Sequence, residues 1–216
     1  AENAFIIQGI AETCPVAEGA RPLTAFIGNI ENYQEQVAPD PLKGIFMVPG
    51  DLPTTVQSAT YQIVAQEDAG VDIVEAIKVS GRDAQSAFTP KVQLAREAGA
   101  NYVYNGSNDV AMTNMRREAA AQGLTGIDVW ACSLACYTQK FEQAGADVQD
   151  TYVWMQFLPF EDKGSNQELD NYLNSVEVPD SFGAQAWMAA VLFQDAINDV
   201  VEKDGPNGIT RASVLE

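Results

Sequence analysis

The side chains that could carry chemistry in this 216-residue sequence are carboxylates, hydroxyls and three cysteines, because histidine is absent. Ser-His-Asp and Cys-His nucleophilic systems and His-ligated zinc sites all require an imidazole group. The phosphate-binding patterns GxGxxG and GxxxxGK[ST] are missing as well. The residue types therefore predict no cofactor and no metal site, and they favour a binding protein over an enzyme.

The three cysteines, Cys14, Cys132 and Cys136, are too few for a disulfide scaffold and form no CxxC pair. Cys132 and Cys136 can form a disulfide if the backbone between them is a loop, whereas a regular helix would make that disulfide strained. We expect this bridge in an oxidising compartment. Cys14 is either a small buried apolar residue or a cysteine whose partner lies outside this chain.

Polar residues follow three predicted strands, at the points where those strands end. In an open parallel sheet the carboxyl ends of the strands meet at one edge, where ligands bind. This rule selects eight candidate ligand-binding residues: Asp51, Thr54, Thr55, Asn105, Ser107, Asp109, Cys132 and Ser133. Free backbone N–H groups at helix starts favour a carboxylate, and Asp51 or Asp109 could accept an ammonium group. Together they would complement a small zwitterion.

Each candidate also has a purely structural interpretation. Asp51 and Asp109 precede predicted helices and are either ligand contacts or helix caps. Thr54 and Thr55 are either ligand contacts or ordinary first-turn residues. The segment 105–107 is either part of the site or a simple turn, and Ser133 either touches ligand or satisfies a local backbone group. The sequence leaves these alternatives open.

The fold class predicted from Gly44 onward is α/β, with a parallel sheet between two layers of helices, because strand-like segments alternate with helices of about 10 to 15 residues. The predicted strands are Ala4–Ile10, Ile45–Val48, Val71–Val79, Tyr102–Tyr104, Val129–Ala131 and Thr151–Leu158. Thr89 is expected to cap a helix that has proline next, and Ser181 to cap a long apolar helix reaching about Lys203.

The charge balance excludes one large class of partners. Thirty acidic residues against twelve basic ones give a formal net charge of −18. Nucleic-acid binding needs clustered Lys and Arg to neutralise phosphates, so we expect no nucleic-acid partner. Since no apolar run approaches the roughly 18 to 20 residues that span a bilayer, we also expect no membrane span in this chain.

The order of these elements, with their connecting residues, resembles the type I solute-binding proteins, the branched-chain amino acid class of ABC-importer receptors. The segments that carry the resemblance are Pro49–Thr55, Tyr102–Asp109, Arg116–Gly123, Val129–Cys132 and Phe182–Ala189. The resemblance covers about Gly44 to Glu216. One position departs from the family: many relatives carry a ligand-covering aromatic residue where this chain reads Leu52-Pro53-Thr54-Thr55.

The resemblance implies two α/β lobes that close on a small ligand. Residues 1–43 would be a remnant of the first lobe and a crossover, residues 44–156 the second lobe, and residues 157–216 a hinge and a return to the first lobe. The protein would be extracytoplasmic, periplasmic or anchored at the cell surface, and would deliver a small solute, an amino acid or related carboxylate, to a membrane permease. The alternatives are a sensor domain of a signalling receptor and, in a different class, a hydrolase using a carboxylate or the Cys14 thiol.

We also expect the chain to be a piece of a longer polypeptide. It begins without an initiator methionine. Its long apolar helix, about Ala184 to Val201, would pack in the family on a first-lobe sheet that this sequence largely lacks.

Overall fold

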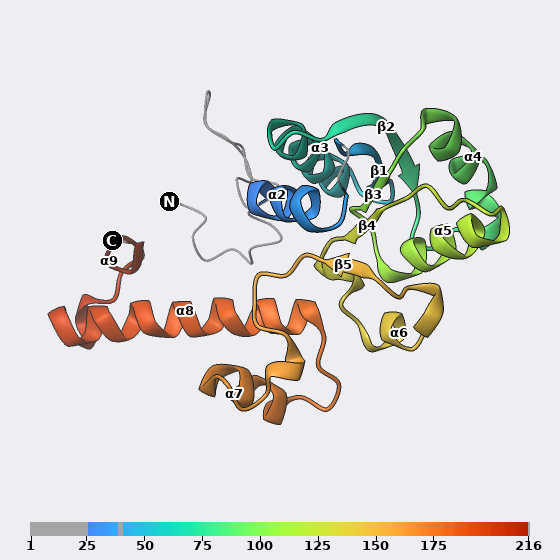
Figure 1. Ribbon diagram of the computed structural model, residues 1–216. Coiled ribbons are helices and arrows are strands. Elements are labelled where there is room, and N and C mark those ends of the chain that lie inside the picture. Colours follow the sequence, from blue (N-terminus) through green and yellow to red (C-terminus); the bar gives the residue numbers. More distant parts are fainter. Residues whose placement is uncertain (1–25, 39–40, 216) are drawn as a thin grey trace. The chain divides into compact units, whose positions relative to one another are not determined.

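The computed structural model describes residues 26–38 and 41–215, which form two compact units divided between Met155 and Gln156 (Figure 1). The first unit contains α2 (Phe26–Gln36), β1 (Lys43–Pro49), α3 (Pro53–Asp68), β2 (Asp72–Val79), η1 (Gln85–Phe88), α4 (Thr89–Ala98), β3 (Tyr102–Asn105), α5 (Asp109–Ala121), β4 (Val129–Cys132), η2 (Leu134–Cys136), α6 (Gln139–Glu142), η3 (Gly145–Asp147) and β5 (Thr151–Val153). The second contains η4 (Phe160–Asp162), α7 (Gln167–Ser175), α8 (Ser181–Asp204), η5 (Pro206–Gly208) and α9 (Arg211–Leu215).

The strands of the first unit form one parallel sheet in the order β2-β1-β3-β4-β5. The α/β class and the parallel pairing of the four central predictions are thereby confirmed. The predicted strand Thr151–Leu158 is wrong in length, because β5 ends at Val153. The Trp154 N–H still donates to the Cys132 carbonyl of β4, at 2.9 Å. The predicted strand Ala4–Ile10 lies outside the described residues.

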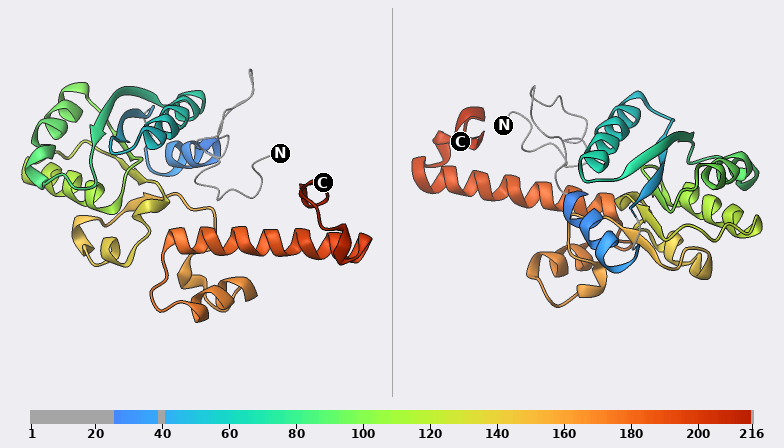
Figure 2. Two further views of the ribbon diagram at one scale, coloured as in Figure 1. Left: turned by 180° about the vertical axis from the view of Figure 1, so that it is seen from behind. Right: turned by 45° about the horizontal axis from the view of Figure 1, so that its top comes forward.

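Helices cover both faces of this sheet (Figure 2). Phe46 and Val48 of β1 face the core beneath α2 and α3, whereas Ile45 and Met47 face the core beneath α4 and α5. This period of two gives a strand that is apolar on both sides, as expected for a sheet buried between two helical layers. The result is the predicted three-layer arrangement. Because the strands are parallel, the loops that follow them lie at the same edge of the sheet.

Two helix starts differ from the sequence-based expectation. Thr89 is the first residue of α4 rather than its cap, because η1 runs directly into the helix and Phe88 occupies the cap position. Its hydroxyl donates instead to Glu118 Oε1 at 2.7 Å. At α8 the capping side chain is Asp180, which accepts from the Gly183 N–H at 2.8 Å, rather than Ser181.

The second unit is built around α8, which packs against α7 through aromatic side chains. The rings of Phe157, Phe160, Tyr172 and Trp187 lie in sequence, with centroids 5.7 to 6.0 Å apart. Phe157, Tyr172 and Trp187 line a pocket of about 250 Å³ between α7 and α8. Farther along α8, Leu192 and Phe193 are 60% and 50% exposed.

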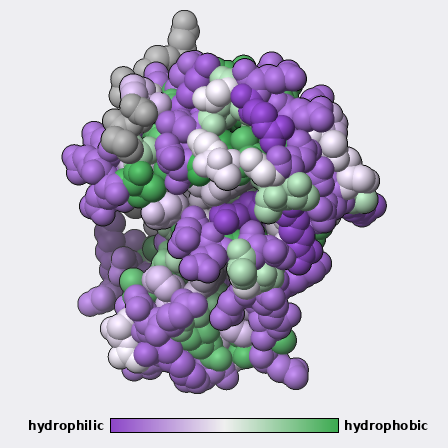
Figure 3. Space-filling view, turned by 45° about the vertical axis from the view of Figure 1, so that its right-hand side comes forward, coloured by the Kyte–Doolittle hydropathy of each residue, from purple (hydrophilic) through white to green (hydrophobic). Residues whose placement is uncertain are grey.

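One face of the surface can be described by its hydropathy. The face seen in Figure 3 is mainly hydrophilic, with apolar residues in patches between polar ones. Among the residues that the structure describes, no helix has the combined length and hydrophobicity that crossing a bilayer demands.

Two buried tyrosines in the core beneath α2 and α3 should make the free energy of unfolding fall at alkaline pH. Burial, with a contribution from neighbouring Tyr152, raises the pKa of Tyr33 to about 12. Burial also raises the pKa of Tyr102, whose hydroxyl donates to Gln66 Oε1 at 2.9 Å. Below about pH 10 these tyrosines are protonated in both the folded and the unfolded state. Above it only the unfolded chain releases the protons, so stability falls as pH rises.

We therefore expect Tyr33→Phe to reduce the alkaline loss of stability. One raised tyrosine lowers the free energy of unfolding by about 1.4 kcal/mol per pH unit between its unfolded and folded pKa values. Urea denaturation at pH 7 and pH 11.5 measures this. Wild type should lose about 2 kcal/mol more than the variant between these pH values, and equal losses would contradict the burial argument.

Candidate functional site

The eight predicted ligand-binding residues lie at the carboxyl edge of the sheet. Asn105 and Cys132 are the last residues of β3 and β4, and the other six lie in the loops and helix starts that follow β1, β3 and β4. Because all five strands are parallel, these segments leave the sheet in the same direction. Their hydrogen bonds show which of these side chains already bind other protein groups and which have polar atoms without a protein partner.

After β1, the chain reaches α3 without a side-chain cap. Leu52 occupies the cap position and Pro53 the first helical turn, so the first-turn amides of α3 have no side-chain acceptor. Thr54 is exposed, whereas the Thr55 hydroxyl donates locally, to the Leu52 carbonyl at 2.8 Å and more distantly to that of Pro49 at 3.1 Å. Asp51 does not cap this helix, because it lies one residue before the cap position.

Asp51 instead joins the loop after β2. Its Oδ2 accepts from the Gly81 N–H at 3.2 Å. Gly81 also lies against Asn108, since a Cβ at position 81 would be 2.9 Å from Asn108 Cγ. Gly81 therefore brings the loops after β1, β2 and β3 together, and only a residue without a side chain fits there without displacing Asn108.

After β3, Asn105 is fully buried and holds the loop that follows it. Its Oδ1 accepts from the Ser107 N–H at 3.0 Å, and its Nδ2 donates to the Asn108 carbonyl at 2.8 Å. The same Nδ2 lies 3.2 Å from Cys132 Sγ and 3.6 Å from Cys136 Sγ. These bonds show that Asn105 holds the turn between β3 and α5 in place.

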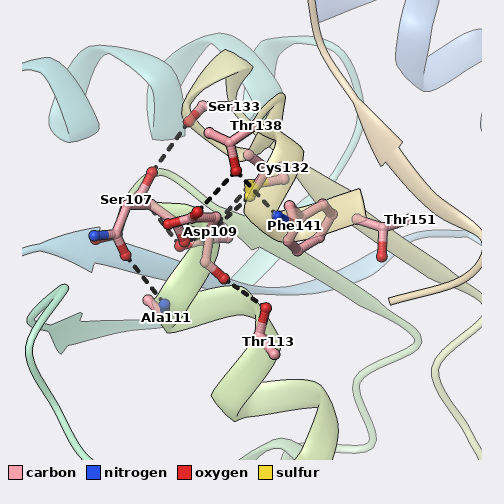
Figure 4. The surroundings of a disulfide bond; sticks show 12 residues. Ser107, Asp109, Ala111, Thr113, Cys132, Ser133, Thr138, Phe141 and Thr151 are labelled. Atoms are coloured by element: carbon pink, nitrogen blue, oxygen red, sulfur yellow. Dashed lines mark hydrogen bonds between the residues drawn. A yellow bond between two sulfur atoms is a disulfide. The ribbon is translucent and has the colours of Figure 1, made fainter. Parts of the chain in front are cut away.

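Cys132 and Cys136 form a disulfide in the structure, with Cα atoms 6.1 Å apart (Figure 4). The segment between them is the short 3₁₀ turn η2 rather than an α-helix, and both cysteines are buried. Together with Met112, Phe141 and Val148 they form a small core below the loops. Cys132 therefore contributes to this core.

The remaining polar residues of the two loops contact one another. The Ser133 hydroxyl donates to the Ser107 carbonyl at 3.3 Å, and the Thr138 hydroxyl donates to Asp109 Oδ2 at 2.8 Å (Figure 4). Asp109 Oδ1 accepts from the Val110 N–H at 2.8 Å. Ser107 is 8% exposed, and its own hydroxyl makes no hydrogen bond among the described residues.

Asp109 is not the cap of α5. Asn108 has extended backbone angles and its side-chain oxygen accepts from the Ala111 N–H at 3.1 Å, so Asn108 is the cap and Asp109 the first helical residue. The capping interpretation of Asp109 is therefore wrong by one residue, and its carboxylate is occupied by Thr138 and Val110.

Glu118, which is not one of the predicted site residues, has a carboxylate that accepts several hydrogen bonds. Hydrogen bonds from Gln122, Thr89 and Gln85 lower the pKa of Glu118. These bonds join α5 to η1 and α4, so Glu118 supports the helical layer. Within residues 26–38 and 41–215, no group of three or more acidic or cysteine side chains could hold a metal ion.

Comparison with known proteins identifies the family. A family model described as periplasmic binding protein matches residues 42–216. The chain belongs to the periplasmic binding protein family. No curated protein sequence matches it. The family model describes binding proteins rather than enzymes, and it confirms that the resemblance noted in the sequence is to this family.

Solved periplasmic binding proteins share this fold at low sequence identity. An ABC transporter substrate-binding protein from Aeropyrum pernix aligns with a TM-score of 0.66 and 13% identity, over 87% of this chain and 51% of that one. A leucine-, isoleucine-, valine-, threonine- and alanine-binding protein from Brucella ovis has a TM-score of 0.66 and 15% identity, over 88% and 47%. A Rhodopseudomonas palustris solute-binding protein in complex with benzoate has a TM-score of 0.57 and 17% identity, over 88% and 48%. The chain therefore spans about half the length of these relatives.

Two residues that shape this edge were missed by the sequence analysis. Gly81 stands in a Ser-Gly-Arg-Asp turn, which indicates a loop but not the three loops it connects. Thr138 begins a short helix, and its hydroxyl accepts from the Phe141 N–H at 3.1 Å as a cap. Its second contact, with Asp109, joins residues 29 positions apart, and no local pattern reports such a pair.

Proposed function

We propose that this chain is part of an extracytoplasmic solute-binding protein that delivers a small carboxylate-bearing solute, an amino acid or a related acid, to an ABC importer. Membership of the periplasmic binding protein family supports this proposal. The observation that carries it is the carboxyl edge of the sheet, where the loops after four neighbouring strands converge in the position that α/β folds use for ligands.

The ligand contacts we assign from this unit are Thr54, Ser107 and Asp51. The uncapped first turn of α3 offers N–H groups, and the positive end of its helix dipole favours a carboxylate. The Thr54 side chain and the Ser107 hydroxyl have no hydrogen-bond partner among the described residues, so each can bind a ligand without breaking an existing bond. Asp51 is exposed and uses one carboxylate oxygen for Gly81, which leaves the other for an ammonium group.

The other five predicted residues have a structural role in this proposal: Asn105, Thr55, Asp109, Cys132 and Ser133. Their polar groups contact protein atoms, so we infer that they shape the site and do not touch the solute. This narrows the eight residues suggested by the sequence to three direct contacts.

Mass spectrometry of the solute that co-purifies with the natural protein tests the function. Calorimetry with that solute, and with the amino acids, then gives its affinity. A carboxylate bound with one-to-one stoichiometry is the expected result. A protein that binds neither amino acids nor other small carboxylates would contradict the proposal.

Thr54→Ala is expected to weaken binding of that carboxylate by about 10- to 100-fold, the effect of one hydrogen bond to a charged group. Thr60→Ala is the matched control, because Thr60 lies on the same helix and donates only to the Val56 carbonyl, at 3.1 Å. Calorimetry on both variants makes the comparison. Equal affinities for the two variants would remove Thr54 from the site.

A further inference from the structure

The loop 105–109, which runs from the last residue of β3 to the first residue of α5, is joined at three points to the segment 132–138, which begins at the last residue of β4. We call these three contacts the clamp: Asn105 with the Cys132–Cys136 disulfide, Ser133 with the Ser107 carbonyl, and Thr138 with the Asp109 carboxylate. Figure 4 shows the Thr138 side chain directed toward Asp109 and the Ser133 side chain directed toward Ser107. The clamp therefore fixes one loop against the other.

At the first contact, the orientation of the Asn105 amide is determined by its partners. Its oxygen must face the Ser107 N–H and its nitrogen must face the Asn108 carbonyl, at 3.0 and 2.8 Å. The nitrogen is then directed at both sulfur atoms of the disulfide. Because Asn105 is fully buried, water cannot replace any of these partners.

At the third contact, the direction of the Thr138 hydroxyl is determined in the same way. Its oxygen accepts from the Phe141 N–H at the start of α6, so its single hydrogen is left for Asp109 Oδ2 at 2.8 Å. Asp109 also accepts from Val110, and its carboxylate is therefore held at the first turn of α5. A neutral hydroxyl and a backbone amide stabilise this charge, and an ammonium group is not needed.

We propose that Thr138, Asn105 and the disulfide are positioning residues of the ligand site, which hold the loop 105–109 so that the Ser107 hydroxyl faces the solute. This inference rests on the proposed function for the role of Ser107. It assigns Asp109 to the clamp, and it leaves Asp51 as the acceptor of any ammonium group in this unit.

Hydrogen exchange of the complete chain tests the clamp without any ligand. In Thr138→Val, which keeps the side-chain volume but loses the hydroxyl, amide exchange in residues 106–110 should accelerate at least 10-fold. Thr138→Ser should restore the wild-type rate. Thr113→Val is the matched control, because Thr113 donates to the backbone carbonyl of Asp109 within α5, at 2.8 Å, and joins no loops. Unchanged exchange in Thr138→Val would overturn the proposal, even if α6 itself became less protected.

The disulfide is tested in the same experiment with the double variant Cys132→Ala/Cys136→Ala. Exchange in residues 106–110 should accelerate at least 10-fold, while exchange in α4 stays within 2-fold of wild type. A loop that keeps its protection without the disulfide would show that the disulfide does not position it.

Calorimetry of the natural protein with L-leucine and with benzoate as probes connects the clamp to binding. Thr138→Val should weaken whichever probe binds by at least 10-fold, and Thr113→Val by less than 2-fold. Full affinity in Thr138→Val despite a loosened loop would overturn the positioning role and leave the proposed function intact. If wild type bound no amino acid or small carboxylate, the proposed function would fail, and hydrogen exchange alone would decide whether the clamp holds the loop.

Discussion

Replacing Phe46 by alanine is expected to lower the free energy of unfolding by about 3 to 5 kcal/mol. Phe46 is fully buried in β1, and its ring packs against Tyr104 with centroids 5.0 Å apart. Alanine would remove this apolar surface and leave a cavity in the centre of the sheet, where neighbouring strands on both sides limit relaxation. Urea denaturation followed by fluorescence measures the loss.

Phe182→Ala is the matched control for this prediction. Phe182 is 59% exposed on α8, so the same substitution there should change the free energy of unfolding by no more than about 0.5 kcal/mol. Similar losses at the two positions would mean that Phe46 does not lie in the core described above.

The same ring supports the candidate site. A Cβ at Gly106 would lie 3.0 Å from Phe46 Cε1 and 3.2 Å from the Met47 carbonyl oxygen, to which the Gly106 N–H donates at 3.0 Å. The loop after β3 therefore rests directly on β1 and its aromatic side chain. This close approach explains why glycine follows Asn105.

The sheet could be predicted from the sequence because its central strands β1, β3 and β4 are largely apolar and buried, and because its strands are separated by helices with clear stop signals. Gly99 and Gly123, which follow α4 and α5, have the positive φ angles of 64° and 65° that favour glycine at a helix end. The predicted length of β5 was too great because most residues from Trp154 to Leu158 are also apolar. Their pairing ends where the chain passes into the second unit, and a residue pattern does not report that change.

Helix caps were harder to predict wherever two capping residues stand side by side. Asn108-Asp109 and Asp180-Ser181 each offer two suitable side chains, and in both pairs the first residue is the cap. Both capping residues have extended backbone angles, with ψ of 177° and 165°. Which residue of a pair makes the turn into the helix depends on how the preceding loop is anchored, and composition alone does not determine it.

The candidate site could be located from the sequence but not divided into ligand contacts and structural residues. The parallel sheet places all eight residues at one edge. The direction of the Asp109 side chain depends on its hydrogen bond from Thr138. The direction of the Asn105 side chain depends on the Cys132 sulfur and on the Asn108 carbonyl. These partners lie in other loops or across the turn, so only the folded geometry reveals them.

Asn105→Leu is expected to lower the free energy of unfolding by about 2 to 4 kcal/mol. Leucine is similar in size and leaves little cavity, so the loss arises from hydrogen bonding. The buried Ser107 N–H and the Asn108 carbonyl would each lose a partner, at about 1 to 2 kcal/mol each, in the lower part of the range for a buried group left unpaired. At about 2 to 4 °C per kcal/mol, the melting temperature should fall by about 5 to 15 °C.

Asn114→Leu is the control, because Asn114 also donates from its side chain to a backbone carbonyl, that of Asp83, at 2.9 Å. It is only partly buried, so water can replace the lost partner, and we expect a loss of no more than about 1 kcal/mol. Calorimetric melting of both variants decides the comparison. If Asn105→Leu were as mild as the control, the polar groups of the loop would be satisfied by water, and the ligand would meet a solvated, adaptable loop instead of a fixed one.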